Sequence, residues 1–175
     1  AAVPEISIVL PFRNKRSQIA ERCAEIFAAL PDRQIELIAI DDGSIDGGAE
    51  QLRALALDDS RLRLVRLRRS FGQTAALAAG FDRARGAIIV TIDADRLTNP
   101  ADIPLLLAAL ESGADIVSGW RDIPRALPTR IGNWLITKVT GVALHDYGCP
   151  LKAYRAELLH EMHLYGDMYR FAPAI

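Results

Sequence analysis

Residues 87–95 read AIIVTIDAD, and this stretch decides the fold class. A short β-branched run that ends at acidic residues is typical of a buried strand followed by a polar loop. Residues 6–10 (ISIVL) and 35–40 (IELIAI) have the same character, and they end at Pro11 and at the sequence DDGS. Because strands that are buried on both faces are typical of parallel sheets, the three runs predict an α/β fold.

Helical patterns separate these strands along the chain. Apolar residues recur at helical spacing between the strands, and Ser17 and Asp46 precede two of the helical stretches as candidate N-caps. This alternation predicts a mostly parallel sheet with helices on both faces. We expect helices at about 19–30, 47–57, 74–84 and 104–111, and two further strands at 62–67 and 114–118.

After Gly119 the alternation ends. Residues 120–128 contain two prolines and predict a loop, and residues 131–140 predict an amphipathic helix. A turn at 147–150 precedes a short extended piece and a helix at about 156–162. The change in composition is too small for a second domain, so we expect an extension that builds one wall of a site.

The composition is that of an ordinary globular domain. The chain has 175 residues, 21 basic and 22 acidic side chains, a net charge of −1 and 50% hydrophobic residues. This balance argues against a disordered acidic tail and against a polybasic arm for nucleic acid. Cys23 and Cys149 are too few for a disulfide framework and favour a reducing compartment. Since neither a membrane-spanning run nor a signal peptide is evident, we expect any membrane role to be peripheral or to depend on residues outside this chain.

Two carboxylates follow the predicted strand at 87–92. Asp93 and Asp95 lie just beyond the carboxyl end of this strand, which is where open parallel sheets bind their ligands. Hard divalent ions such as Mg²⁺ take oxygen ligands and keep positions open for substrate phosphates. The pair is therefore a candidate metal site, and the alternative is a polar turn in which an aspartate caps the next helix.

Two other stretches have a structural and a functional interpretation. Asp41 and Asp42 begin the DDGS sequence, which fits either a turn with a helix cap or a carboxylate that accepts hydrogen bonds from a base or ribose. Residues 61–69 are rich in arginine, which is most simply an edge strand with solvated charges. The alternative is a phosphate contact by Arg68 or Arg69.

With these motifs in place, the chain resembles the GT-A-fold, inverting glycosyltransferases of family 2. Within that family it is most similar to the polyisoprenyl-phosphate glycosyltransferases, which include dolichyl-phosphate mannose synthases and bacterial undecaprenyl-phosphate sugar transferases. The resemblance runs along nearly all of the chain, and its last segment favours the bacterial branch. It rests on IELIAIDDGSIDG, on RRSFGQTAALAAGFDRARGAIIVTIDAD followed by NPADIP, and on HDYGCPLKAYR.

The resemblance implies one catalytic domain over 1–175, with a nucleotide-sugar half at 1–119 and an acceptor-side extension at 120–175. It implies metal-dependent, inverting transfer of a sugar from a nucleoside-diphosphate sugar to a polyprenyl phosphate, with Mg²⁺ or Mn²⁺. A UDP-sugar is the favoured donor, and GDP-mannose is the alternative. We expect the full-length protein at the cytoplasmic face of the bacterial inner membrane, held by segments outside this chain, and the chain itself to be soluble. Nucleic acid is not an expected partner, and an oligomer is left open.

The resemblance also assigns roles to individual residues. Asp93 and Asp95 would hold the metal ion, and Asp95 and Asp146 are the candidate catalytic residues. Because a phosphate acceptor is already largely dianionic at neutral pH, we expect Asp146 to orient the acceptor rather than to deprotonate it. The nucleotide would contact Pro11, Phe12, Arg13, Asp41, Asp42, Asp93 and Ala94. The acceptor phosphate would contact Arg121, Arg130, Lys152 and Arg155.

Two motifs depart from the family pattern. The family has P-x-Y-N-E after the first strand, where this chain has PFRNK, so Lys15 replaces an acidic residue. The family has DADLQ, where this chain has DADRL, so Arg96 stands beside the metal pair and could neutralise part of its charge. These departures leave open a degenerate domain that binds a nucleotide or partner without turnover. A phospho-acceptor signalling domain is disfavoured, because Arg13 and Lys15 stand where it needs an acidic pair.

Overall fold

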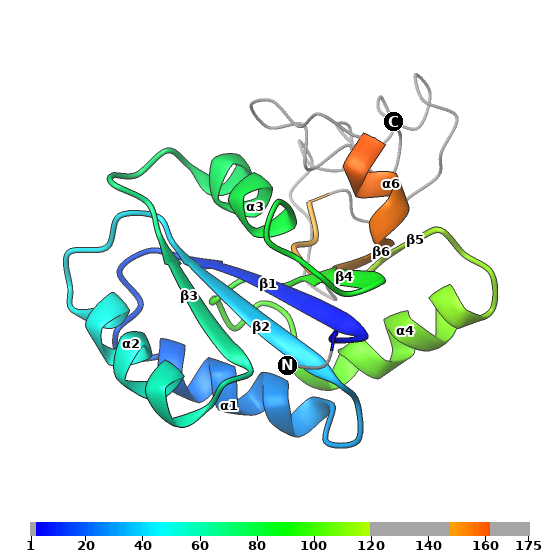
Figure 1. The fold of residues 1–175 in the computed structure, drawn as a ribbon, viewed down its shortest axis with the longest axis horizontal. Coiled ribbons are helices and arrows are strands. Elements are labelled where there is room, and N and C mark those ends of the chain that lie inside the picture. The colour runs from blue at the N-terminus through cyan, green and yellow to red at the C-terminus, as the bar shows by residue number, and fades with distance from the viewer. Residues whose placement is uncertain (1–2, 120–147, 162–175) are drawn as a thin grey trace, which may run out of the picture.

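The computed structural model describes residues 3–119 and 148–161 (Figure 1). Within these ranges, strands and helices alternate as the sequence predicts. The strands are β1 (Ile6–Phe12), β2 (Ile35–Asp41), β3 (Leu62–Arg66), β4 (Ile88–Thr91), β5 (Ile116–Ser118) and β6 (Lys152–Arg155). The helices are α1 (Ile19–Ala29), α2 (Gly48–Asp58), α3 (Gln73–Phe81), the short 3₁₀ turn η1 (Pro100–Asp102), α4 (Ile103–Glu111) and α6 (Ala156–Glu161). The loop and the helix predicted at 120–128 and 131–140 lie outside the described residues.

The described strands form one sheet with the order β3-β2-β1-β4-β6-β5. β1, β2, β3 and β4 run parallel to one another, as strands joined by helical crossovers do. The order reverses at β1, because β2 and β3 lie on one side of it and β4 lies on the other. Such a switch point is the usual place for a ligand beyond the carboxyl ends of the strands in an open α/β sheet.

β6 runs against both of its neighbours. It lies between β4 and β5 and pairs antiparallel with each, so that Lys152 is opposite Thr91 and Arg155 is opposite Ile88. The sequence predicts an extended piece here but does not predict its place in the sheet. Because β6 is antiparallel, Lys152 lies at the carboxyl edge of β4 and Arg155 lies at the opposite edge.

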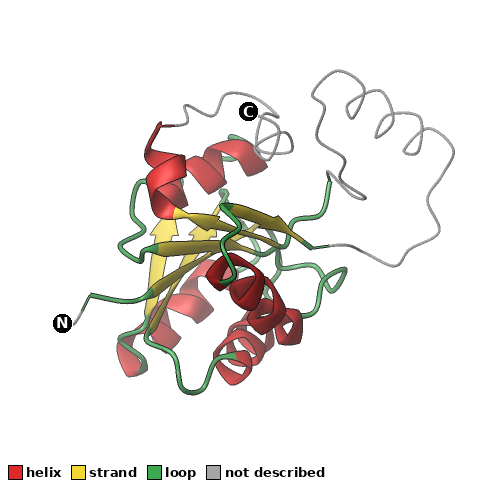
Figure 2. Cartoon of the chain, turned by 90° about the vertical axis from the view of Figure 1, so that its right-hand side faces the viewer, coloured by secondary structure: helices red, strands yellow, loops and turns green. Residues whose placement is uncertain are grey.

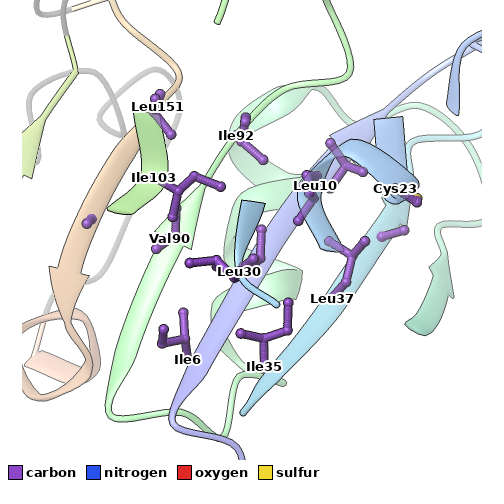
Figure 3. Packing of buried hydrophobic residues seen from close by; sticks show 14 of the residues in the cluster. Ile6, Leu10, Cys23, Leu30, Ile35, Leu37, Val90, Ile92, Ile103 and Leu151 are labelled. Atoms are coloured by element: carbon purple, nitrogen blue, oxygen red, sulfur yellow. The ribbon is translucent and has the colours of Figure 1, made fainter. Parts of the chain in front are cut away.

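Helices cover both faces of the sheet, which confirms the predicted layers (Figures 1 and 2). α1, α2 and α4 pack on one face, where Ile6 and Leu10 of β1 join Cys23 and Ile103 in one apolar cluster (Figure 3). α3 and α6 pack on the other face. All residues of β1 and β2 are buried, as expected for central strands with continuous apolar sequences. In the described part of the chain, we find no helix with the length and apolar character of a membrane span.

The start of α1 differs from the prediction. The residue before the helix is Gln18, and its side chain makes no capping hydrogen bond. The prediction that Ser17 caps this helix is therefore wrong. The helix is held by its apolar side instead, since Ile19, Cys23 and Ile26 are buried against the sheet.

The prediction of an edge strand in the arginine-rich stretch is confirmed. β3 ends the sheet on one side and pairs only with β2. Three arginines of this stretch have carboxylate partners nearby: Arg61 pairs with Asp59, Arg63 with Glu36, and Arg66 with Glu50.

Candidate active site

The loops that follow β1, β2 and β4 meet at the carboxyl edge of the sheet. They line a cavity of about 220 Å³ together with the start of α3. The two acidic motifs, which are far apart in the sequence, therefore share one site. The cavity is lined by Pro11, Phe12, Arg13, Lys15, Asp42, Gln73, Ala76, Asp93, Ala94 and Asp95.

Asp41 is one predicted nucleotide-binding residue that does not line this cavity. It is fully buried, and its Oδ1 accepts a hydrogen bond from the backbone N–H of Ser44 at 2.7 Å. Its Oδ2 lies 3.2 Å from Arg66 Nε, and it accepts no hydrogen bond from the described residues. For Asp41 the structure therefore supports the interpretation of DDGS as a turn.

Asp42 anchors the loop before α3. Its carboxylate accepts hydrogen bonds from the hydroxyl of Ser70 at 2.7 Å and from the backbone N–H groups of Phe71 at 2.7 Å and Gly72 at 3.1 Å. A carboxylate has about four lone-pair positions, so about one remains for a ligand. Asp42 thus lines the cavity and also places Gln73 in its wall.

Asn14 ties the loop after β1 to the DDGS turn. Its backbone N–H donates to the hydroxyl of Ser44 at 2.9 Å, and its side-chain oxygen accepts from the N–H of Ile45 at 2.9 Å. Asn14 has a φ of 52°, a left-handed conformation in which asparagine is enriched. The reciprocal bonds hold the loop that carries Arg13 and Lys15 on the cavity wall.

Asp46 makes a second tie between the same two loops. Its carboxylate accepts hydrogen bonds from the backbone N–H groups of Arg16 at 2.8 Å and Gly48 at 2.9 Å. These bonds, the one from Arg16 above all, hold the pKa of Asp46 below its usual value. The residue before α2 is Gly47, so Asp46 supports the start of the helix from one position further back than an N-cap.

Asp93 and Asp95 both line the cavity, but different groups contact them. The carboxylate of Asp95 forms an ion pair with the ammonium group of Lys15. The carboxylate of Asp93 lies 3.4 Å from the hydroxyl of Thr98. The loop from Asp93 to Thr98 is therefore linked to the loop after β1 through Lys15, and Thr98 links its two ends.

Arg22 of α1 holds this loop in place, although Arg22 is not among the site residues predicted from the sequence. The side chain is only 3% exposed, and its guanidinium donates to the carbonyls of Asp93 at 3.1 Å and Thr98 at 2.9 Å. The position of Arg22 in the helical pattern could have indicated this role. Arg22 lies on the apolar side of the predicted helix, three residues after Ile19 and four before Ile26, where a charge is costly unless it is paired.

Arg96 does not neutralise the acidic pair. Its guanidinium forms an ion pair with Glu21 and lies 3.9 Å from a carboxylate oxygen of Glu25, and both glutamates belong to α1. The expectation drawn from its place beside Asp95 is therefore wrong, because the side chain extends to the helix. Lys15, which is distant in sequence, supplies the positive charge at Asp95 instead.

The cavity residues fit a hard divalent cation. Asp93 and Asp95 both line the cavity and offer carboxylate oxygens as ligands. The carboxylate of Asp95 is already paired with a positive charge, the ammonium group of Lys15. Within residues 3–119 and 148–161, no group of three or more His, Cys, Asp or Glu side chains is arranged to hold a metal. Two protein carboxylates with further ligands from phosphate and water is the usual arrangement for Mg²⁺.

The predicted acceptor-phosphate residues do not come together in the described part of the chain. Lys152 is 2% exposed and lies opposite Thr91 at the end of β4, near the carboxyl edge. Arg155 lies at the other edge of the sheet, where its guanidinium donates to the carbonyl of Leu110 at 2.9 Å. The structure does not bring Arg155 to the cavity. Three further candidates lie outside the described residues: Arg121, Arg130 and Asp146.

Two named relatives match nearly the whole chain. A dodecaprenyl-phosphate galacturonate synthase of Rhizobium johnstonii is 42% identical over 181 residues, which cover 97% of this chain and 53% of that protein. An undecaprenyl-phosphate 4-deoxy-4-formamido-L-arabinose transferase of Pseudomonas paraeruginosa is 36% identical over 178 residues, which cover 97% of this chain and 52% of that protein. The chain thus spans about half the length of these relatives.

Solved structures share the fold. Glucosyl-3-phosphoglycerate synthase of Mycobacterium tuberculosis, solved with Mn²⁺, UDP-glucose and phosphoglyceric acid, has a TM-score of 0.68 at 27% identity, with 89% of this chain and 58% of that chain covered. A mannosyltransferase of Pyrobaculum calidifontis, solved with GDP-Man and Mn²⁺, has a TM-score of 0.68 at 24% identity, with 94% and 48% covered, which shows likeness of fold alone.

These findings confirm the predicted GT-A architecture, a mostly parallel sheet with helices on both faces. The family model described as "Glycosyl transferase family 2" matches residues 7–162, which include all of the described strands except the first residue of β1. Since this match covers most of the chain, the chain belongs to glycosyl transferase family 2.

Proposed function

We propose that this domain transfers a sugar from a nucleoside-diphosphate sugar to a polyprenyl phosphate. The cavity at the switch point of the sheet carries the proposal, because it combines two carboxylates for a divalent ion with two basic side chains for a diphosphate. Both relatives described above are named for prenyl-phosphate substrates, which supports this class of acceptor. The neighbour at 27% identity was solved with UDP-glucose, which supports a UDP-sugar donor ahead of GDP-mannose.

The cavity suits the nucleotide rather than the whole donor. Its volume of about 220 Å³ is below the roughly 300–1,000 Å³ that is typical of complete ligand pockets. Arg13 and Lys15 line it from the loop after β1, and Asp42 lines it from the loop after β2. We therefore assign the nucleoside diphosphate to this cavity, with the basic pair beside its phosphates.

In the proposed reaction, an oxygen of the acceptor phosphate forms a bond to the anomeric carbon while the bond from that carbon to the donor diphosphate breaks. Attack from the side opposite the leaving group inverts the configuration. A phosphomonoester has a second pKa near 6, so the acceptor is largely dianionic at pH 7 and needs no strong base. In this proposal Asp146 orients the acceptor.

The negative charge that develops on the leaving diphosphate is stabilised by Arg13 and Lys15, whose side chains line the cavity. Mg²⁺ or Mn²⁺, held by Asp93 and Asp95 when bound, supplies further neutralisation of the same charge. Arg22 keeps the backbone of that loop in position by its bonds to the carbonyls of Asp93 and Thr98.

A thermal-shift titration tests the donor assignment. We expect UDP and UDP-glucose, with Mn²⁺, to raise Tm by about 5 °C at roughly 100-fold excess over Kd, and GDP and GDP-mannose to raise it less. Asp95→Asn should remove the Mn²⁺-dependent part of this shift. Asp58→Asn, which changes an exposed aspartate at the end of α2, is the matched control and should leave the shift intact. A shift that survives Asp95→Asn unchanged would remove the metal role of that residue.

A nucleotide-binding domain without turnover is the second candidate. The ion pair between Lys15 and Asp95 favours it, because a lysine replaces an acidic residue of the family pattern and contacts a predicted metal ligand. A transfer assay with UDP-glucose and undecaprenyl phosphate in vesicles separates the two candidates. Metal-dependent nucleotide binding without sugar transfer or donor hydrolysis by the full-length protein would favour the second.

A further inference from the structure

Lys15 departs from the family pattern and lines the cavity of about 220 Å³ in which we place the donor diphosphate. It stands where the pattern has an acidic residue, and its ammonium group pairs with Asp95 across the cavity wall. We propose that Lys15 is a donor-positioning residue, whose ammonium group competes with the divalent ion for Asp95 and moves onto the donor diphosphate when the ion binds. This inference rests on the proposed function, since it names how that same site loads its ligands.

The pair is built so that it can exchange partners. The side chains of Lys15 and Asp95 are 30% and 49% exposed, and ion pairs with this exposure are weak. The carboxylate of Asp42 is held more firmly, since it accepts three hydrogen bonds. Of these two carboxylates, Asp95 is therefore the one whose present partner a divalent ion displaces more easily.

Lys15 is also well placed to take up a new partner. It lies on the same cavity wall as Arg13, and Asn14 between them is fixed by its bonds to the DDGS turn. The lysine side chain is a flexible four-carbon stem with a compact charge at its end. When the ammonium group leaves Asp95, it remains within the cavity in which we place the diphosphate.

The charge balance of the cavity explains how the exchange of Lys15 from Asp95 to the diphosphate favours binding of the donor. The wall carries three carboxylates, on Asp42, Asp93 and Asp95, and two cations, on Arg13 and Lys15. A bound divalent ion converts this single excess negative charge into a single excess positive charge, which attracts a diphosphate. With a neutral residue at position 15, the empty cavity would attract the ion more strongly, and the loaded cavity would carry no net charge for the diphosphate.

It follows that Lys15 weakens the binding of the ion alone and strengthens the binding of the nucleotide to the loaded site. Both effects favour arrival of the ion together with the nucleotide. Because binding free energies are linked, the nucleotide must raise the affinity for the ion by the same factor by which the ion raises the affinity for the nucleotide. Lys15 should increase this factor.

The test compares the wild-type chain with Lys15→Gln by two measurements. Electron paramagnetic resonance gives the Kd of Mn²⁺ without nucleotide, and calorimetry gives the Kd of UDP and of GDP at saturating Mn²⁺. We expect Lys15→Gln to bind Mn²⁺ about fivefold more tightly and the nucleotide about fivefold more weakly. Lys15→Arg, which keeps the charge, should return both values toward those of the wild type.

Arg96→Gln is the matched control. It removes the same charge beside Asp95 in the sequence, but Arg96 pairs with Glu21 and does not line the cavity. It should leave both Kd values within about twofold of the wild type. If Arg96→Gln also bound Mn²⁺ more tightly and the nucleotide more weakly, the effect would be one of net charge in general, and the role of Lys15 would be overturned.

Other outcomes against the inference are equally distinct. Unchanged Mn²⁺ affinity in Lys15→Gln, or a loss of both affinities together, would show that Lys15 only supports the loop. If the wild-type chain binds neither UDP nor GDP with Mn²⁺, the proposed function fails. The Mn²⁺ measurement without nucleotide still reports whether Lys15 competes for Asp95, so the two failures are distinguishable.

Discussion

Glu36 shows, at the scale of one residue, how this fold retains a buried charge. Its side chain is 2% exposed, and its carboxylate accepts hydrogen bonds from the hydroxyl of Ser7 at 2.7 Å and from the guanidinium groups of Arg63 and Arg85, each at 2.8 Å. Burial alone would raise the pKa of Glu36, but the bonds from Arg85, Ser7 and Arg63 outweigh burial and lower it. Because Ser7 and Glu36 lie near the amino ends of β1 and β2, this cluster is remote from the cavity at the carboxyl ends of these strands.

We expect Glu36→Gln to lower the free energy of unfolding by about 1–3 kcal/mol at pH 7, because it removes the charge that the two arginines bind. Since the folded pKa of Glu36 is lowered, its stabilisation is present above the usual glutamate pKa of about 4.3. That stabilisation is lost as the pH falls through the folded value. Urea denaturation of both proteins at several pH values should show a difference that shrinks toward low pH.

Glu157→Gln is the control for this series, because Glu157 is exposed on α6. It should change the free energy of unfolding by less than about 0.5 kcal/mol. A loss in Glu36→Gln that stays constant with pH would mean that shape and packing, rather than the charge, make Glu36 important.

At the scale of elements, the cavity at the carboxyl edge of the sheet depends on close packing between the DDGS turn and the loop before α3. Gly43 has a φ of +69°, and a Cβ on it would lie 2.6 Å from the backbone nitrogen of Ser70 and 2.7 Å from the carbonyl carbon of Arg69. The hydrogen bonds of Asp42 join the same two segments. The glycine is therefore needed both for the turn and for the approach of the second backbone.

Gly43→Ala should cost about 2 kcal/mol or more of unfolding free energy, because the backbone of one loop must move away. Gly113→Ala is the matched control, since Gly113 has a φ of +111° but no atom would lie within 4 Å of its Cβ. This control should cost less, about 1–2 kcal/mol, from conformation alone. Urea denaturation measures both, and equal losses would show that backbone conformation, and not the contact between loops, limits position 43.

At the scale of the whole molecule, β6 joins the last part of the chain to the sheet. It lies between β4 and β5, so these two strands have no direct pairing with each other in the described sheet. The same segment adds Leu151 and Ala153 to the apolar cluster on one face and Tyr154 to the cluster on the other. Burial of its side chain raises the pKa of Tyr154, so that side chain stays neutral.

A fragment of residues 1–119 should therefore fail to fold cooperatively. It would expose the unpaired edge of β4, leave β5 without a partner and uncover apolar residues on both faces. Circular dichroism should show a broad thermal transition for the fragment, in contrast to a sharp one for the full chain. A sharp transition near the Tm of the full chain would mean that the first 119 residues form an independent unit.

The sequence by itself determined the order of strands and helices from β1 to β4 and the parallel arrangement of those strands. It also placed Asp42, Asp93 and Asp95 at one edge of the sheet. Local periodicity marks each element, and the carboxyl ends of parallel strands must lie at the same edge. For this reason the cavity lies at the edge of the sheet where the sequence predicts a ligand site.

Only the tertiary structure decided which side chains meet at that edge. Lys15 contacts Asp95 from 80 positions away in the sequence, Arg22 reaches across from α1, and Arg96 turns to the glutamates of that helix. β6 enters the sheet between strands that precede it by more than 30 residues. Contacts of this kind depend on how the elements pack and on where flexible charged side chains find partners, and neither is encoded in the periodicity of a single segment.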